Sequence, residues 1–243
     1  MQIKNPFTMW GRIERCWLLA YRAPLSEINA LLPPPLEAVS REGFGFYNVV
    51  ICRIKDMRPW PLPGLFGFSY WHVAYRIYVR FRSREGDYEE GLYFLRSDCD
   101  KDWLVTVGNK LTDFRFHSAK LQFEENATQA EEKTFRICSH GSDAVLRIEK
   151  GDVSQLEEGS VFADIREAEV FLKYKPKGIG FPAKGLVQVV NIERDERAWK
   201  HRLVRVKEQN FDFLQGSGAR FELCYEVGPI DYVWKKGRSV GYA

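Results

Sequence analysis

The sequence has no long apolar run, few cysteines and no excess of charge of one sign. No stretch reaches the roughly 20 apolar residues that a membrane-spanning helix needs, and residues 1–12 lack the apolar core of a signal peptide. The 36 basic and 33 acidic side chains are interspersed, with no basic stripe of the kind that nucleic-acid-binding proteins carry. We therefore expect a cytoplasmic protein that binds neither nucleic acid nor membrane.

Residue patterns that mark common cofactor and metal sites are also missing. The five cysteines are scattered without paired spacing, which predicts reduced thiols in the interior. The four histidines lie far apart and include no His-Glu helical pair, so we expect no metal ion. A phosphate-binding loop, a dinucleotide-binding glycine pattern and a nucleophile elbow are absent, so we expect no cofactor.

What the chain does contain is a high content of strand-forming residues. Hydrophobic residues make up 45% of its 243 positions and aromatics 14%, enough for one sizeable core. Two short helices are expected: one at 24–32, where Ser26 can cap the first turn, and one within 162–174. The segment 103–114 begins with strand-forming residues, and its residues 108–111 indicate a short helical turn. We predict a single β-rich domain over 1–243, a sandwich or a barrel. The candidate strands are 15–21, 44–53, 70–82, 91–95, 116–123, 134–138, 144–150, 186–192, 203–207 and 220–227.

Two histidines are candidates for a pocket. In YWHVAYR (70–76), strand alternation places His72 and Arg76 on one face and Trp71 on the other. His117 is flanked by bulky residues in FRFHSAK (114–120), and a pKa near neutrality suits proton transfer. Each histidine by itself fits a surface or hydrogen-bonded role equally well.

The order of several motifs over about 15–121 resembles the acetoacetate decarboxylase-like superfamily. These motifs are LAYR (19–22), LLPPPLE (31–37), the strand 70–79, GLYFL (91–95), and GNKL (108–111) followed by Phe114. Within the superfamily, GLYFL and FHSA (116–119) are most similar to the uncharacterised YqjF-like branch. The resemblance implies a closed or nearly closed antiparallel double-cone β-barrel with a few short helices and an internal ligand site. It also implies a homo-oligomer.

The catalytic residues of the decarboxylases are not present at the matching positions. Those enzymes form a Schiff base on the first of two adjacent lysines and use two pocket glutamates, and a neutral amine is needed for the attack. In this chain the lysine pair aligns with Phe116 and His117, and the glutamates align with Asn48 and His72. Lys120 is the nearest substitute, but alternation places it on the opposite face from His117 unless a bulge intervenes.

Our leading hypothesis is a protein that binds a small organic acid or keto compound, with His117 or His72 as the acid or base if it is an enzyme. One alternative is a Schiff-base decarboxylase that uses Lys120. Another is a non-catalytic interaction protein whose aromatic loop 60–68 docks a partner, which requires that loop to be exposed. The other expected ligand-binding residues are Asn48, Arg76, Trp71, Phe94, Phe114, Phe116 and Lys120.

Overall fold

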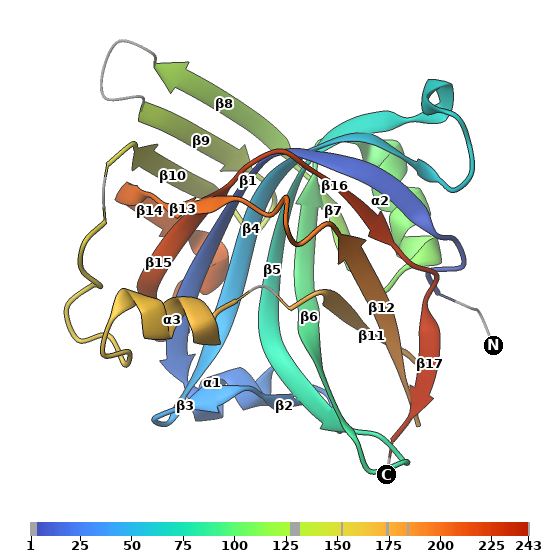
Figure 1. The fold of residues 1–243 in the computed structure, drawn as a ribbon, viewed down its shortest axis with the longest axis horizontal. Coiled ribbons are helices and arrows are strands. Elements are labelled where there is room, and N and C mark those ends of the chain that lie inside the picture. Colours follow the sequence, from blue (N-terminus) through green and yellow to red (C-terminus); the bar gives the residue numbers. More distant parts are fainter. Residues whose placement is uncertain (1–3, 127–131, 152, 174, 184, 243) are drawn as a thin grey trace.

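The computed structural model describes residues 4–126, 132–151, 153–173, 175–183 and 185–242. Strands predominate, and the helices are short (Figure 1). The strands are β1 (Met9–Pro24), β2 (Glu37–Ala38), β3 (Ser40–Arg41), β4 (Phe44–Pro59), β5 (Phe68–Arg82), β6 (Tyr88–Cys99), β7 (Phe116–Ser118), β8 (Lys120–Asn126), β9 (Glu132–Cys138), β10 (Ala144–Glu149), β11 (Lys177–Ala183), β12 (Leu186–Arg194), β13 (His201–Leu203), β14 (Arg205–Phe211), β15 (Arg220–Val227), β16 (Ile230–Trp234) and β17 (Arg238–Gly241). The helices are α1 (Leu25–Ala30), α2 (Asp102–Leu111) and α3 (Ile165–Phe171), with 3-10 turns η1 (Gly64–Phe66) and η2 (Asp212–Leu214).

The larger sheet closes into a ring. From β1 the hydrogen-bonded neighbours run through β16, β12, β11, β6, β5 and β4, and β4 pairs again with β1. Most pairs are antiparallel, but β11 and β7 each run parallel to β6. Closure gives both edges of these strands a partner, which removes open edges from this part of the sheet. The predicted strand-rich fold is therefore confirmed.

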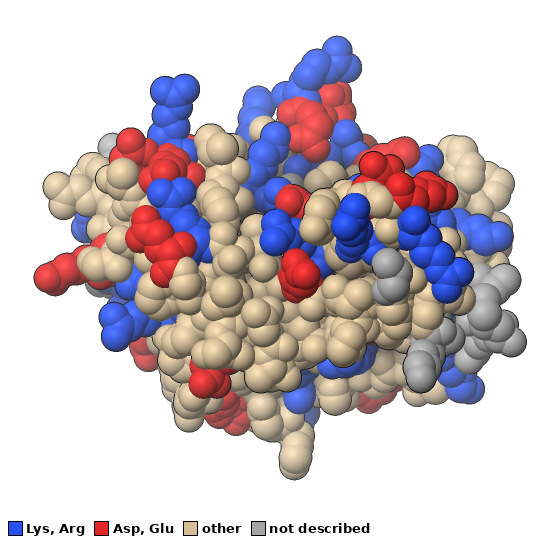
Figure 2. Space-filling model, turned by 90° about the horizontal axis from the view of Figure 1, so that it is seen from below, with Lys and Arg blue, Asp and Glu red and all other residues tan. Residues whose placement is uncertain are grey.

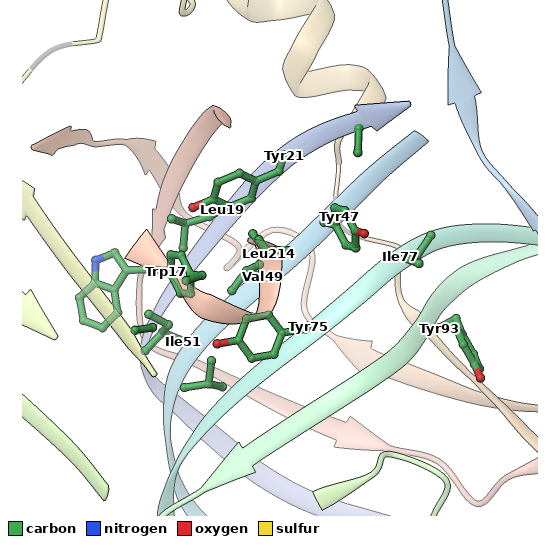
Figure 3. Packing of buried hydrophobic residues seen from close by; sticks show 14 of the residues in the cluster. Trp17, Leu19, Tyr21, Tyr47, Val49, Ile51, Tyr75, Ile77, Tyr93 and Leu214 are labelled. Atoms are coloured by element: carbon green, nitrogen blue, oxygen red, sulfur yellow. The ribbon is translucent and has the colours of Figure 1, made fainter. Parts of the chain in front are cut away.

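A second sheet, in the order β14-β10-β9-β8, covers part of the outer face of the ring. Odd-numbered side chains of β1, β4 and β5, including Trp17, Val49 and Tyr75, pack in this layer (Figure 3). Trp17 meets Phe135 of β9 edge-on, with 4.5 Å between ring centroids. The even-numbered side chains of the same strands point into the ring. Because both faces are covered, these strands are apolar on both sides.

The helices follow the sequence signals in part. α1 lies within the predicted helix, but the expected cap was wrong: Pro24 occupies the N-cap position without a side-chain cap bond, and Ser26 falls inside the first turn. α3 lies within the predicted 162–174, and Asp164 caps it by accepting a hydrogen bond of 2.8 Å from the backbone N–H of Glu167. α2 is a helix of 10 residues where the sequence indicated a single turn.

Charges of both signs are interspersed on the face of the molecule seen in Figure 2. No basic stripe crosses this face, in agreement with the near balance of charge in the sequence. In the described part of the chain, none of the helices combines the length and the apolar character needed to cross a bilayer.

Candidate functional site

Three of the predicted polar residues lie on the inner face of the ring. Asn48 on β4 and His72 and Arg76 on β5 are all buried, with 2%, 7% and 4% of their surfaces exposed. Asn48 lies opposite Arg76 in the β4–β5 register, and His72 lies opposite Cys52. Alternation along β5 explains why His72 and Arg76 share this face, as the sequence predicted.

A chain of hydrogen bonds crosses the interior from β5 to the end of α3. The guanidinium Nη2 of Arg76 donates to Oδ1 of Asn48, and Nδ2 of Asn48 donates to the hydroxyl of Tyr78 at 2.8 Å. The hydroxyl of Tyr78 in turn donates to the carbonyl of Leu172 at 2.9 Å. The guanidinium of Arg76 also lies over the ring of Phe94, 5.6 Å from its centroid. Arg76 is thus a buried cation with a fixed position.

His72 borders an apolar pocket of about 290 Å³, which we call the His72 pocket. Its ring stacks on Phe116 of β7, with centroids 5.6 Å apart. Phe114 also lines the pocket, and its ring packs against that of Phe94, with 4.3 Å between the ring centroids. Trp103 of α2 and Trp234 of β16 complete the opposite sides. The wall is mostly carbon, so a ligand there would have to present mainly apolar surface.

The imidazole of His72 is neutral at ordinary pH and has an unused polar atom. Burial, reinforced by the positive charge of Arg76, lowers the pKa of His72 from 6.5 to about 3. Its Nε2 is buried and has no hydrogen-bond partner among the described residues. A buried polar atom without a partner costs about 1–3 kcal/mol, which a ligand can recover by bonding to it.

A second pocket of about 310 Å³ lies on the other side of Arg76 along β5. Asn48 and Tyr78 line it, together with residues of α3 and of the segment 196–201. We call it the α3 pocket. No described residue lines both pockets. The sequence analysis expected Asn48 and His72 to share one cavity, but they line different pockets, and Arg76 lies between His72 and Tyr78 along β5.

His117 and Lys120 are not in either pocket, because both are exposed on the surface. His117 follows Phe116 on the short strand β7, and alternation turns it outward where Phe116 points inward. Lys120 begins β8, where the chain has left the ring for the second sheet. The expectation that His117 shares a cavity with His72, Asn48 and Arg76 is not met. Burial and Arg96 lower the pKa of His117, opposed by Asp98.

Trp71 lies on the opposite face of β5 from His72. Its ring packs between the two sheets against Phe123 and Phe135, with centroid distances of 5.5 and 5.9 Å. It therefore belongs to the core between the sheets. Phe94, Phe114 and Phe116, in contrast, belong to the inner cluster as expected.

Sequence reasoning missed Tyr78 and Tyr225. Tyr78 has even spacing from His72 and Arg76 on one predicted strand, so alternation alone could have placed it on the inner face. Tyr225 lies on β15, far away in sequence, and no local signal points to it.

The interior also holds thiols. Burial raises the pKa of Cys52 to about 12 and that of Cys99 to about 11. All five cysteines are free. Within the described residues, no group of three or more His, Cys, Asp or Glu side chains is placed to hold a metal ion.

Solved structures with this fold include enzymes. Acetoacetate decarboxylase from Legionella pneumophila subsp. pneumophila str. Philadelphia 1 is 14% identical, with a TM-score of 0.64 over 96% of this chain and 87% of that one. An acetoacetate decarboxylase-like enzyme from Sphingomonas wittichii RW1 is 13% identical, with a TM-score of 0.61 over 100% and 96%. The enduracididine biosynthesis enzyme MppR, complexed with pyruvate, is 13% identical, with a TM-score of 0.58 over 98% and 91%. At these identities the likeness shows the fold alone.

No curated protein matches this sequence. The profile of one family, DUF2071, described as an uncharacterized conserved protein (COG2071), matches residues 11–227. That match covers most of the 243 residues. The chain therefore belongs to the DUF2071 family and has an acetoacetate decarboxylase-like fold.

Proposed function

We propose that the protein binds a small organic acid or keto compound in the His72 pocket. The apolar body of the ligand contacts Phe114, Phe116 and Trp234, and one ligand oxygen bonds to Nε2 of His72. The observation that carries this proposal is that His72, which lines a pocket of about 290 Å³, has a buried Nε2 without a hydrogen-bond partner among the described residues. A ligand oxygen would supply the missing partner.

The electrostatics of the pocket favour an oxygen with negative or partly negative charge. The positive charge of Arg76 is close enough to His72 to lower its pKa. A ketone dipole or a carboxylate with its oxygen toward His72 is stabilised by that field, whereas an ammonium ion is repelled. MppR, which has the same fold, has been seen in complex with pyruvate, a small keto acid.

Within this proposal His72 is the acid or base of any reaction, because it is the histidine that borders the pocket. A bound carboxylate would oppose the effect of Arg76 and raise the pKa of His72 toward the range useful for proton transfer. The position aligned with the Schiff-base lysine carries Phe116, whose ring stacks on His72. Lys235, which also lines the pocket, is paired with Glu193 at 2.9 Å. Lys120 is exposed, so no observation favours the decarboxylase alternative.

The test is titration calorimetry with a ketone and a carboxylate of equal length, 2-heptanone and hexanoate. We expect His72→Phe to weaken binding at least about tenfold, or about 1.4 kcal/mol, because the ring is replaced by one of similar width without Nε2. His117→Phe is the matched control, since it removes an exposed imidazole and should leave affinity unchanged. Equal affinities for the native protein and His72→Phe would refute the assignment.

The loop between β4 and β5 supports a second candidate function, the binding of a partner protein. Trp60, Leu65 and Phe66 are 65%, 89% and 59% exposed, so the loop presents the apolar surface that this alternative requires. It projects beside α2, where Phe68 meets Trp103 at 4.7 Å (Figure 1). Apolar side chains gathered at the surface are typical of sites where proteins associate.

A further inference from the structure

We propose that the α3 pocket is a second binding site, for a neutral hydroxylated ring of monosaccharide size. This inference does not depend on the ligand of the His72 pocket. Its starting point is Tyr225, one of the residues that line the α3 pocket. Tyr225 is only 7% exposed, and its Oη has no hydrogen-bond partner among the described residues. A ligand hydroxyl can both donate to and accept from this group.

The α3 pocket combines polar anchors with an aromatic wall. Its floor carries the amide of Asn48 and the hydroxyl of Tyr78, both held in place by the bonds that lead to Arg76 and Leu172. Trp199 forms part of the wall, and the guanidinium of Arg194 lies 3.5 Å from the centroid of its ring. An indole ring beside fixed hydroxyl and amide groups suits a ring with one apolar face and several hydroxyls.

The charges around the pocket select a neutral ligand. The carboxylate of Glu169 lies 3.6 Å from Nε2 of His201, and that of Glu196 is paired with Arg194 at 2.9 Å. Lys173 stands at the rim, and the cation of Arg76 lies behind Asn48. A cationic ligand would meet Lys173 and the field of Arg76, and an anionic ligand would meet Glu169 and Glu196. A neutral ligand avoids both repulsions.

Burial, followed by the negative charge of Glu169, raises the pKa of Tyr225. The phenol therefore keeps its proton at every ordinary pH and remains a donor as well as an acceptor. The α3 pocket has a volume of about 310 Å³, at the lower end of the range for ligand pockets. This volume limits the occupant to one ring.

Three probes with the same ring and different charge test the proposal: glucose, glucosamine in slightly acidic buffer, and glucuronate. Binding is followed by NMR through the indole N–H signal of Trp199. We expect glucose to shift this signal at millimolar concentration and to bind more tightly than either charged analogue. Preference for glucosamine or glucuronate would overturn the neutral class, and an unmoved signal with all three would overturn the site.

Tyr225→Phe removes the one unpartnered oxygen. We expect the variant to keep its thermal midpoint, because no bond is lost in the free protein, and to bind glucose about three- to tenfold more weakly. Tyr88→Phe, which removes an exposed hydroxyl outside both pockets, is the matched control. Unchanged affinity in Tyr225→Phe would contradict the proposal. His72→Phe should leave glucose binding intact, so failure of one site is distinguishable from failure of the other.

Discussion

At the scale of single residues, the clearest energetic consequence concerns His72. Its pKa is lowered from 6.5 to about 3 in the folded state, so between these pH values the unfolded chain binds a proton that the folded protein does not. Stability from this residue is therefore complete above pH 6.5 and is lost as the pH falls toward 3. As the pH falls from 6.5 toward 3, we expect the free energy of unfolding to decrease by about 1.4 kcal/mol per pH unit because of His72.

Urea denaturation at a series of pH values measures this slope. His72→Phe should flatten it, because the substituted ring does not titrate. His117→Phe should retain most of it, since the exposed imidazole of His117 has a smaller shift. A slope that is the same in the native protein and in His72→Phe would show that His72 can be protonated in the folded state.

The cysteines give a second prediction at this scale. Cys16, Cys52, Cys99 and Cys224 are buried, and burial raises the pKa of each thiol, so thiolate is scarce and inaccessible. Cys138 is exposed. We expect one thiol per chain to react rapidly with Ellman's reagent in the native state and the other four after denaturation. Cys138→Ser should abolish the fast phase; a persistent fast phase would mean that the interior opens on the time scale of the reaction.

Alternation was a sound guide to individual side chains only inside long strands. It placed His72 and Arg76 together and Trp71 opposite because β5 is continuous from 68 to 82. It could not place His117, since β7 has only three residues and its direction depends on pairing with β6. The residues that line the α3 pocket together with Tyr225 come from segments distant in sequence. No periodicity in the sequence predicts that these segments lie close together.

Among the elements, β1 and β15 are joined by a buried ion pair. Arg22 of β1 bonds to Glu222 of β15, with side-chain exposures of 3% and 0%, and Ser160 donates to the second carboxylate oxygen at 2.5 Å. Removal of the carboxylate leaves a buried guanidinium without this counter-ion. We expect Glu222→Ala to lower the free energy of unfolding by about 3–5 kcal/mol, measured by urea denaturation.

The surface pair between Arg12 of β1 and Asp231 of β16 provides the control. Its side chains are 47% and 53% exposed, so water already solvates both charges. Asp231→Ala should therefore cost less than about 1 kcal/mol. Similar losses in the two variants would contradict the role of burial in the first pair.

The existence of the strands was easier to predict than their extent. β1 and β4 each continue several residues beyond the predicted segments, because the two strands pair with each other along nearly their whole length. α2 was reduced to a turn in the prediction because its Val105, Thr106 and Val107 are strand-forming by preference. Packing of Leu104 and Gly108 on the ring overrides that preference.

For the whole molecule, several of the exposed apolar side chains lie at the end that carries the His72 pocket. Trp103 and Val107 of α2 line that pocket and are 48% and 41% exposed. The loop between β4 and β5 projects beside α2 (Figure 1), and its Leu65 is 89% exposed. Together with the homo-oligomers that the superfamily resemblance implies, this leads us to expect self-association through this end. Sedimentation velocity over a concentration series should show it.

The double variant Leu65→Ser with Phe66→Ser should shift that equilibrium toward monomer, because it replaces the most exposed apolar groups of the loop. A double substitution of Tyr88→Ser and Val170→Ser, which lie outside this end and are also exposed, is the control. Identical sedimentation of native protein and the Leu65/Phe66 variant at all concentrations would exclude association through the loop.

The high strand content could be predicted from periodicity, but ring closure could not. β1 pairs with β4 on one edge and with β15 and β16 on the other, and its partners in β16 lie more than 200 positions away in the sequence. Only the order of motifs shared with a superfamily suggested a closed arrangement. The division of the interior into two pockets by Arg76 had no signal in the sequence.

The same pairing has a consequence for synthesis on the ribosome. β1 is made before its neighbours β15 and β16, at 220–234, which follow it by roughly 200 residues. At about 5–20 residues per second, the nascent chain carries β1 with one open edge for roughly ten seconds or more. During that interval the open edge of β1 can pair with a strand of another chain unless a chaperone covers it. The ring can close only after β16 has left the exit tunnel, because β16 joins β1 to β12.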